Sequence, residues 1–485
     1  MLPKLTGLND AFRVLQSILD NPRPVLVYFD PDVDGMISGW LLCQWLNKNG
    51  ISFSTYVNPN RKHGFLLPYE SVKGLTILSG DFTVTHEIMK NLVENYGVTY
   101  LSLDHHDNPE EQTVFEGESG NLGVMVNNQY PGNPDWNKFQ SGAGVVWQVL
   151  ASFDSSFDNK LYRGMVGWTL LSDARDISSD EARSFLTDLF SLNKHTPYIG
   201  KLISSVLECR RDYDFGVPRM DRYFVDFYMT PAINSMLRFG KEREALKFVL
   251  SGVYPKVDYH QCQKNLVKDI MEHANIREFG DSFCSVTISL KDFPPDIQEI
   301  LGNFIGLVCS RFSDTHNVVG RVIDSEGITV RSSFRGRSSG APYKDYIIKE
   351  TGLDCRGHQE AFGIKDERIS EEQLEKAGIA CESAEESVNE VTPNIIEVNN
   401  FGSWVKKHGH EVAEENGYRM SAQRTYIRLG ESVKMYLVTR TNKFALYNID
   451  GYEVKYFGDD PENPGDLIDT YLTRGNIKFV FATDL

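Results

Sequence analysis

The chain has 485 residues, enough for about three domains, and its 41% hydrophobic and 24% charged residues are ordinary for a globular protein. The 67 acidic and 50 basic residues leave a net charge of −17, which excludes a histone-like coat protein but not one basic groove. No apolar run approaches the ~20 residues of a membrane span, and the first residues lack a signal-peptide pattern. The seven cysteines stand singly, which favours a reducing compartment over disulfides or a zinc cluster. We therefore expect a cytoplasmic protein with no membrane partner.

The N-terminal third alternates helical and β patterns, which is typical of an α/β fold with a parallel sheet. Helical spacing predicts a first helix over residues 8–20, ended by Pro22 and Pro24. Short apolar runs, typical of strands buried on both faces, predict strands over residues 25–29, 75–79 and 98–103. Helical segments lie between these strands, over residues 35–50 and 85–96.

Acidic residues and histidines follow each of the three predicted strands. They are Asp30, Asp32 and Asp34 after the first strand, Asp81 after the second, and Asp104, His105 and His106 after the third. Because the carboxyl ends of parallel strands meet at one edge of a sheet, these side chains are expected to lie together, where such sheets bind ligands. A single Asp after a strand is more often a helix cap or turn residue. Three successive strand ends make coincidence a poor explanation.

Converging carboxylates repel one another, at about 4 kcal/mol for two charges 4 Å apart in an effective dielectric of ~20. Few lysines or arginines stand nearby, so bound cations are the simplest source of compensation. Carboxylates with one or two imidazoles suit Mn²⁺ or Mg²⁺ better than zinc. Two such ions, bridged by a carboxylate about 3.5–4 Å apart, activate water against a phosphate. The sequence therefore predicts a two-metal site for Mn²⁺, with Mg²⁺ as the alternative.

The acidic residues and histidines that follow the three strands resemble the first three motifs of the DHH phosphoesterases, and Asp173 in LLSDARD resembles the fourth. Residues 58–67, 126–148 and 230–240 resemble segments of the RecJ exonuclease branch, and residues 302–312, 333–336 and 356–363 resemble the nucleic-acid-binding DHHA1 domain. The resemblance runs in family order from about residue 8 to 365. It implies an exonuclease that degrades single-stranded DNA 5′→3′ to 5′-mononucleotides, in recombination and repair. It further implies a single-strand-binding protein or a helicase as a partner.

The resemblance also implies roles for individual residues. The implied metal ligands are Asp30, Asp32, Asp34, Asp81, His105 and Asp173. Among them Asp81 would bridge the two ions. RecJ proteins usually carry a His where this chain has Tyr28, so Asp30 or a water would complete the shell of the first ion. Asp104 would orient His105, and His106 would contact the scissile phosphate or protonate the leaving oxygen.

The implied substrate contacts lie in the segments that resemble the RecJ branch and DHHA1. They are Arg61, Asn234, Arg238, Ser333, Arg335, Gly357 and His358. Arginine forks match phosphate oxygens, and glycines let backbone amides approach a ligand. Arg356, which replaces the first Gly of the DHHA1 motif, would add a phosphate contact. The site itself is expected between the DHH and DHHA1 domains, in a cleft that admits one strand but not a duplex.

A Glu/Ser-rich stretch with ten acids and three bases, residues 365–397, marks the clearest domain boundary, and we expect an exposed helix followed by a linker. The predicted domains are a DHH domain over 1–205, a helical connector over 206–255, a DHHA1 domain over 256–365, an acidic linker over 366–400 and a β-rich domain over 401–485. In the last, Tyr426, Arg428, Tyr436, Arg440 and Tyr447 would form a stacking platform of the OB type, with an ordinary half-buried sheet as the alternative.

Two other functions remain open from the sequence. The first is a DHH phosphodiesterase for short oligonucleotides or cyclic dinucleotides, which usually lacks the segments resembling 58–67 and 230–240. The second is a non-catalytic replication scaffold of the Cdc45 type. Such scaffolds have lost metal ligands, and here Tyr28 alone favours that interpretation.

Overall fold

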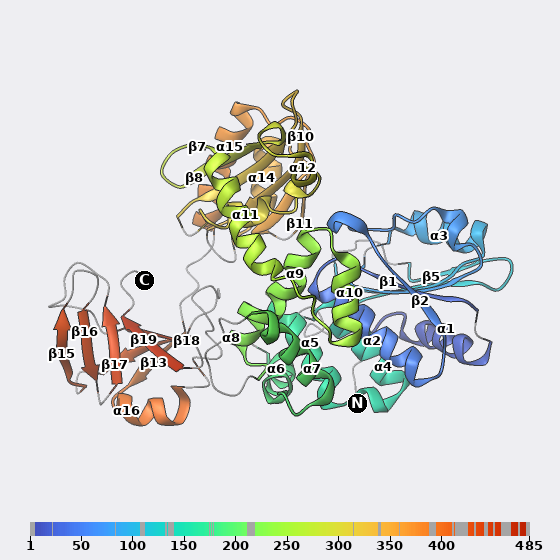
Figure 1. The fold of residues 1–485 in the computed structure, drawn as a ribbon, viewed down its shortest axis with the longest axis horizontal. Helices are drawn as coiled ribbons and strands as arrows, with labels where there is room; N and C mark the ends of the chain where they lie inside the picture. Colours follow the sequence, from blue (N-terminus) through green and yellow to red (C-terminus); the bar gives the residue numbers. More distant parts are fainter. Residues whose placement is uncertain are drawn as a thin grey trace. The chain divides into compact units, whose positions relative to one another are not determined.

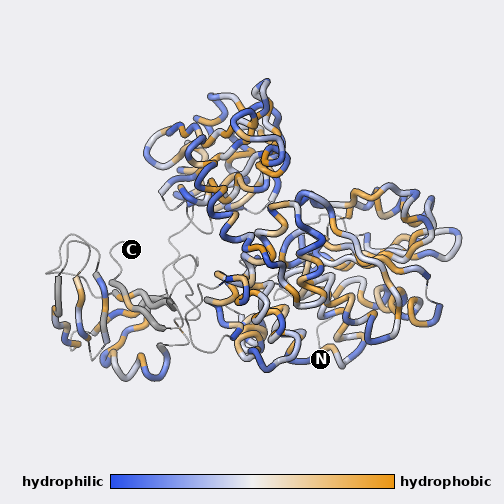
Figure 2. The backbone as a smooth tube through the Cα atoms, viewed as in Figure 1, coloured by the Kyte–Doolittle hydropathy of each residue, from blue (hydrophilic) through white to orange (hydrophobic). Residues whose placement is uncertain are grey.

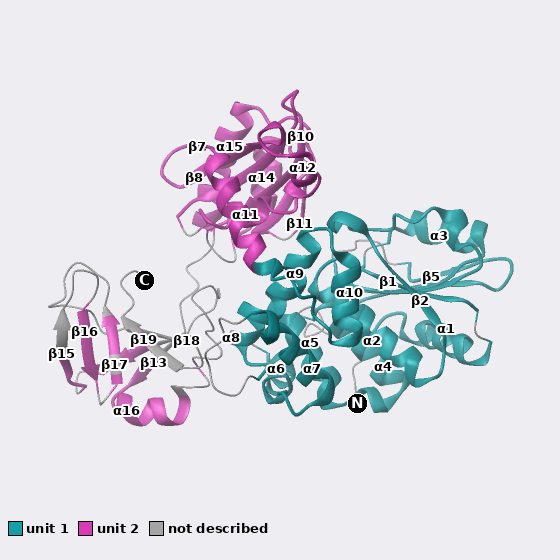
Figure 3. Ribbon diagram, viewed as in Figure 1, with its two compact units in different colours: residues 1–260 teal, residues 261–485 magenta. Residues whose placement is uncertain are grey.

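The computed structural model describes residues 5–21, 23–82, 84–106, 112–130, 133, 140–173, 175, 177, 179–210, 219–313, 315–337, 341–357, 359–387, 394–409, 412, 425–430, 433–440, 445–449, 452–456, 467–473 and 476–481. The chain divides into two compact units, residues 1–260 (unit 1) and residues 261–485 (unit 2), coloured separately in Figure 3. No helix among the described residues combines the length and the apolar character needed to cross a bilayer.

Unit 1 is built on a six-stranded sheet of order β2-β1-β3-β4-β6-β5 (Figure 1), and every neighbouring pair is parallel except β5 with β6. The strands are β1 (Val25–Phe29), β2 (Phe53–Val57), β3 (Thr76–Gly80), β4 (Thr99–Asp104), β5 (Val114–Glu116) and β6 (Leu122–Asn127). The predicted α/β fold is confirmed, and the three predicted strands lie within one residue of β1, β3 and β4.

The strands β1, β3, β4 and β6 of this sheet are buried at every residue, so both of their faces are covered, which explains the apolar runs in the sequence. Successive residues of β1 point to opposite faces, so Val27 joins one hydrophobic cluster and Tyr28 another. Helices α1 (Leu8–Asp20), α2 (Val33–Lys48) and α4 (Gly142–Phe153) pack on the first face, and α3 (His86–Tyr96) packs on the second. Long hydrophobic stretches are visible in the central strands in Figure 2.

The remaining helices of unit 1 contribute to the same core as α2 and α4. They are α5 (Lys160–Ser172), α6 (Asp180–Ser191), α7 (Pro197–Cys209), α8 (Arg222–Phe224), the π-helix η5 (Val225–Met229), α9 (Thr230–Arg238) and α10 (Glu242–Ser251). Residues 206–255 were expected to form a helical connector. Their described part is largely helical, but buried side chains such as Met229 and Phe248 join the core of unit 1.

Unit 2 contains a second six-stranded sheet of order β11-β12-β10-β9-β8-β7, antiparallel except for β8 with β9. Its strands are β7 (Asn275–Glu278), β8 (Phe283–Ser289), β9 (Asn317–Ile323), β10 (Thr329–Arg335), β11 (Cys355–Gly357) and β12 (Ala361–Ile364). The accompanying helices are α11 (Tyr259–His273), α12 (Pro295–Leu301), α13 (Ile305–Cys309), α14 (Tyr343–Thr351) and α15 (Glu371–Ser387).

The helix expected to be exposed in the acidic stretch is α15, and the structure corrects this expectation. Leu374, Ala377, Cys381 and Ala384 lie on one face of α15 and are buried in the core of unit 2. Their helical spacing was hidden by the many Glu and Ser residues on the opposite face. Only residues 388–393 separate α15 from the next strand, and they lie outside the described residues.

The C-terminal region is β-rich, as predicted, and its sheet has the order β13-β14-β18-β19-β17-β16-β15. The strands are β13 (Asn394–Val398), β14 (Thr425–Leu429), β15 (Met435–Arg440), β16 (Ala445–Ile449), β17 (Tyr452–Tyr456), β18 (Leu467–Thr473) and β19 (Asn476–Phe481), with the short helix α16 (Phe401–Trp404). Among the described strands, β13 and β15 have one partner each, so the sheet is open, whereas an OB fold closes five strands into a barrel.

The expected stacking platform is also corrected. Tyr447 is buried in the core of this sheet, whereas Tyr436 is 60% exposed. Tyr436 pairs with Asn448, the neighbour of Tyr447, and adjacent residues of a strand point to opposite faces. These two tyrosines therefore lie on different faces of the sheet.

Candidate metal centre

The carboxyl ends of three central strands carry the candidate metal site of unit 1. Asp30 directly follows β1, Asp81 directly follows β3 and His105 directly follows β4. Asp32 caps α2 by accepting a hydrogen bond from the Gly35 N–H at 2.9 Å. The two remaining candidates are Asp34 in the first turn of α2 and Asp173 at the C-terminal end of α5.

The six predicted ligands come together in sets of three whose ligand atoms lie within 4.8 Å of one another. The sets are Asp30, Asp32 and Asp81; Asp34, His105 and Asp173; and Asp81, His105 and His106. Asp81 therefore belongs both to the set with Asp30 and Asp32 and to a set with His105. This is the position expected of a bridging carboxylate.

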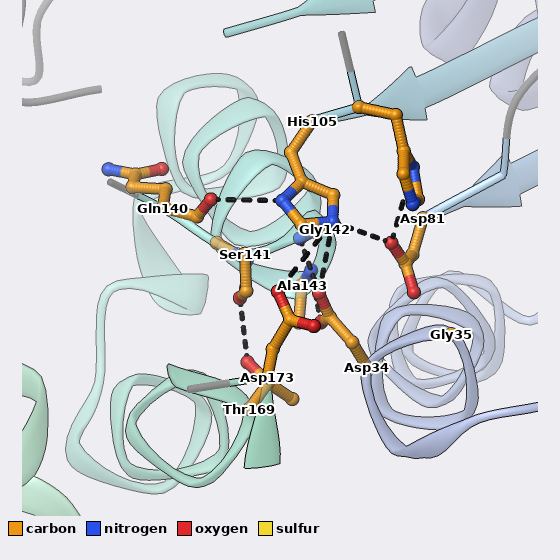
Figure 4. Close-up of polar contacts among 12 residues, drawn as sticks. Asp34, Gly35, Asp81, His105, Gln140, Ser141, Gly142, Ala143, Thr169 and Asp173 are labelled. Carbon is orange, nitrogen blue, oxygen red and sulfur yellow. Dashed lines mark hydrogen bonds and ion pairs between the residues drawn. The ribbon is translucent and has the colours of Figure 1, made fainter. Parts of the chain in front are cut away.

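His105 points one ring nitrogen, Nε2, toward three carboxylates (Figure 4). Its Nδ1 lies 3.2 Å from the backbone carbonyl of Gln140, an acceptor, so Nδ1 donates a proton there and Nε2 is the nitrogen available to a metal ion. That Nε2 lies 3.0 Å from Asp81 Oδ1, 3.8 Å from Asp34 Oδ2 and 4.0 Å from Asp173 Oδ2. Three carboxylates thus converge on one ring nitrogen, and a bound cation can satisfy all of these groups at once.

Two buried oxygens in this group have no hydrogen-bond partner among the described residues, Asp81 Oδ1 and Asp173 Oδ2. Asp81 also has a left-handed backbone, with φ 59°, which is uncommon for a residue other than Gly. A Cβ at Gly142 would lie 2.3 Å from the Cβ of Asp81, so glycine is needed for this approach. The donor set, its orphaned oxygens and its oxygen-rich chemistry fit two divalent ions such as Mn²⁺ or Mg²⁺.

The N-terminus of α4 holds Asp34. The backbone N–H groups of Gly142 and Ala143 donate to Asp34 Oδ2 and Oδ1 at 2.6 and 2.8 Å. These N–H groups have no partner within the helix, and the helix dipole favours a negative charge at this end. The local signal in the sequence was SGAGV, in which small residues open the helix and Ser141 caps it.

Burial and mutual repulsion shift the pKa values of the carboxyl groups upward. Burial, then the charges of Asp34, Asp32 and other carboxylates, raises the pKa of Asp81 well above its ordinary value. The pKa of Asp34 is likewise raised well above its ordinary value by burial and by Asp173. Burial raises the pKa of Asp173 to about 6 despite the nearby charge of Arg175. The metal-free site therefore resists full ionisation.

We expect metal-free protein to lose stability as pH rises from about 4 to about 6, where Asp173 ionises in the unfolded chain but stays protonated in the fold. The folded state binds this proton more tightly, so the Asp173 contribution is present below pH 4 and is lost as pH passes 6. A rise of the Asp173 pKa from 3.8 to about 6 corresponds to roughly 3 kcal/mol. Thermal melts in chelator, comparing wild type with Asp173→Asn, isolate the effect. A wild-type stability that rises relative to the variant over this range contradicts it.

His106 is held as a cation beside the site. Burial lowers its pKa, but the carboxylates of Asp104, Asp30 and Asp32 outweigh burial and raise the pKa to about 10. Its Nδ1 lies 2.8 Å from Asp104 Oδ1, and its side chain is 43% exposed. Asp104 was expected to orient His105. It accepts the His105 backbone N–H at 2.8 Å, so it acts there on the backbone, and the ring it orients is that of His106.

The predicted substrate contacts of unit 1 lie on neighbouring elements. Arg61 belongs to the short helix η1 (Pro59–Arg61), and α9, which carries Asn234 and Arg238, contacts η1. Burial raises the pKa of Asp32, but the charge of His63, the Gly35 N–H and then the charge of Arg61 outweigh it and hold that pKa low.

The predicted contacts of unit 2 lie on β10 and β11. Arg335 Nη1 donates to Ser333 Oγ at 2.9 Å and to the Phe334 carbonyl at 2.7 Å, and no carboxylate pairs with Arg335 among the described residues. Burial lowers its pKa. Gly357 has a φ of 134°, open only to glycine, and His358 lies outside the described residues. Arg356, in contrast, is exposed and forms two hydrogen bonds to Asp354, so its guanidinium already has a carboxylate partner.

Three contributors to the site were not singled out from the sequence. They are the carbonyl of Gln140, the N–H pair at the start of α4, and His63, whose Nδ1 lies 2.6 Å from Asp30 Oδ2. The first two are backbone groups, and backbone groups carry no residue-type signal. His63 stood within the segment 58–67, but its partner lies on another element.

The fold is that of RecJ. RecJ of Thermus thermophilus in complex with Mn²⁺ matches with a TM-score of 0.66 and 15% identity, over 100% of this chain and 72% of that one. The same protein with Mg²⁺ gives 0.60 and 14%, over 100% and 70%. A further exonuclease RecJ bound to manganese gives 0.54 and 16%, over 80% and 97%. At these identities the likeness establishes the fold.

The curated relatives match a smaller part of this chain than the RecJ structures do. YorK of Bacillus subtilis (strain 168), named as a candidate single-strand DNA-specific exonuclease of the SPβ prophage, is 22% identical over 246 residues. The match covers 50% of this chain and 40% of YorK, and YorK of Bacillus phage SPβ matches equally. The chain thus spans well under half the length of these relatives. No family model matches it.

Proposed function

We propose that the protein is a RecJ-like phosphodiesterase that hydrolyses single-stranded DNA with two divalent ions, Mn²⁺ or alternatively Mg²⁺. The observation that carries the proposal is the buried cluster of carboxylates around Asp81 and His105, at the ligand-binding edge of a RecJ-type sheet, in which buried carboxylate oxygens have no hydrogen-bond partner among the described residues. When bound, the ions would neutralise phosphate charge and lower the pKa of water.

The residues of this chain would have the following roles. One ion would be held by Asp30 and Asp32 and the other by Asp34, His105 and Asp173, with Asp81 shared. Asp104 keeps His106 cationic, so its exposed Nε2–H can donate to a phosphate oxygen or to the leaving oxygen.

The proposal extends to 5′→3′ polarity, release of 5′-mononucleotides and a role in recombination and repair in the cytoplasm. A single-strand-binding protein or a helicase would be the partner. The resemblance of residues 58–67 and 230–240 to the RecJ branch supports this extension.

One experiment tests the proposal against its rivals. The full chain with Mn²⁺ is given an end-labelled single strand of about 40 nucleotides, a trinucleotide and a blunt duplex, with Asp81→Ala as the inactive control. We expect the long strand to be degraded and the duplex to remain. Cleavage of the trinucleotide alone would favour a short-oligonucleotide phosphodiesterase. Binding without cleavage of any substrate would favour a scaffold.

A further inference from the structure

His63 contacts a candidate metal ligand from a separate loop. Its Nδ1 lies 2.6 Å from Oδ2 of Asp30, and the Asp30 side chain is 4% exposed. Because the partner atom is a carboxylate oxygen, Nδ1 is the protonated nitrogen and donates the hydrogen bond. His63 is not in any of the sets of three ligand atoms, which argues for an effect on the ion through Asp30 rather than direct ligation.

Tyr28 ties both ends of the loop that carries His63. Its phenol donates to Asn58 Oδ1 at 2.5 Å and accepts the Leu66 N–H at 3.1 Å. The Asn58 amide in turn donates to the Gly64 carbonyl at 2.7 Å. Tyr28 and Asn58 are both fully buried, so the hydrogen bond between them is shielded from water, whereas the bonds to Leu66 and Gly64 are partly buried. We call these residues, Tyr28, Asn58, Gly64 and Leu66, the loop clamp.

The same loop has an unusual backbone between the ends of the clamp. Asn60 and Arg61 are both left-handed, with φ 54° and 51°. This conformation is uncommon for residues other than Gly, more so for Arg than for Asn, and it persists where the surroundings enforce it. The buried carboxylate of Glu242 does so by accepting the Asn60 N–H at 2.6 Å. The loop is therefore held by Tyr28 at Asn58 and at Leu66, and by Glu242 at Asn60.

We propose that His63 is a positioning residue for the first metal ion and that the loop clamp holds it in place. The Nδ1–H group fixes one oxygen of Asp30 and leaves the other for the ion shared with Asp32 and Asp81. Tyr28 stands at the position where RecJ proteins usually carry a His. It thus supports the metal site indirectly, through the loop that carries His63. This inference rests on the proposed metal site.

The test measures Mn²⁺ binding to the full chain by titration calorimetry, with free Mn²⁺ counted by electron paramagnetic resonance. His63→Ala should weaken the binding of one of the two ions about 10–100-fold and leave the binding of the other unchanged. Loss of a hydrogen-bond partner of a metal ligand has an effect of this size on metal affinity in other proteins. His63→Asn places an amide N–H near the position of Nδ1–H and should recover most of the loss. The exposed His195, on the link between α6 and α7, provides the control variant His195→Ala, which should bind as wild type does.

A double-mutant cycle tests the clamp. Tyr28→Phe removes only the hydroxyl and should weaken the binding of the same ion. In the His63→Ala background it should cause no further loss of affinity. Unaltered Mn²⁺ binding by His63→Ala, while wild type binds two ions and cleaves DNA, overturns this inference alone. An equal effect of Tyr28→Phe in both backgrounds overturns the clamp. A wild type that binds no Mn²⁺ overturns the inference together with the proposed function.

Discussion

Asp81→Asn should abolish catalysis and yet stabilise the metal-free protein. The substitution removes the carboxylate shared by both ion positions, so we expect the cleavage rate to fall at least about 1000-fold, or ~4 kcal/mol. It also removes a charge that burial and four neighbouring carboxylates oppose. In the metal-free state at pH 7–8 the variant should therefore melt several degrees higher than wild type.

The two effects of Asp81→Asn have opposite signs, so simple misfolding cannot imitate them. Rates on a labelled single strand and melts in chelator measure them separately. Asp154→Asn is the control, because Asp154 lies on the surface and its partners, Lys48 first, lower its pKa despite some burial. That variant should lose a little stability and keep its activity. A metal-free Asp81→Asn protein less stable than wild type would show that the carboxylates do not repel one another as described.

Arg335→Ala should weaken single-strand binding about 10–100-fold. A half-buried guanidinium without a carboxylate partner among the described residues has unused capacity for an anion, and a charged hydrogen bond contributes about 1.5–3 kcal/mol. Loss of one phosphate contact should also reduce the salt dependence of binding by about 0.7 in the log–log slope. Fluorescence anisotropy with a labelled strand measures both, with Ca²⁺ in place of Mn²⁺ to slow cleavage.

The matched control for Arg335 is Arg277→Ala. Arg277 lies on β7 of the same sheet, but it is exposed and pairs with Glu371. Its removal should leave affinity and salt slope nearly unchanged. Equal losses in both variants would assign the effect to net charge, and no loss in Arg335→Ala would remove Arg335 from the substrate contacts.

The sequence predicted the parts of the fold in which local pattern and burial agree. The strands β1, β3 and β4 are buried throughout and mostly apolar because both faces are covered, and the acidic residues directly after them come together because parallel strands end at one edge. The metal candidates could thus be found without tertiary information. The helix α15 could not, because composition concealed its apolar spacing.

Other features depend on contacts between distant segments. Nothing local to His63 indicates that its loop folds onto the end of β1, or that the hydroxyl of Tyr28 fastens that loop. The opposite orientations of Tyr436 and Tyr447 follow from strand register, which a run of aromatic and basic residues does not determine. Residue types at strand ends were informative, whereas loop docking and register required the structure.

The backbone contact between Asp34 and α4 provides a spectroscopic reporter inside the protein. The Gly142 and Ala143 amides each donate to one oxygen of the same carboxylate. Amide proton frequencies respond to the charge and distance of the acceptor, so these two signals should shift together whenever Asp34 gains or loses a proton or an ion. Gly142 and Ala143 lie in a buried helix, where exchange with solvent is slow. Occupancy of the centre can therefore be followed by nuclear magnetic resonance, without substrate and without any attached label.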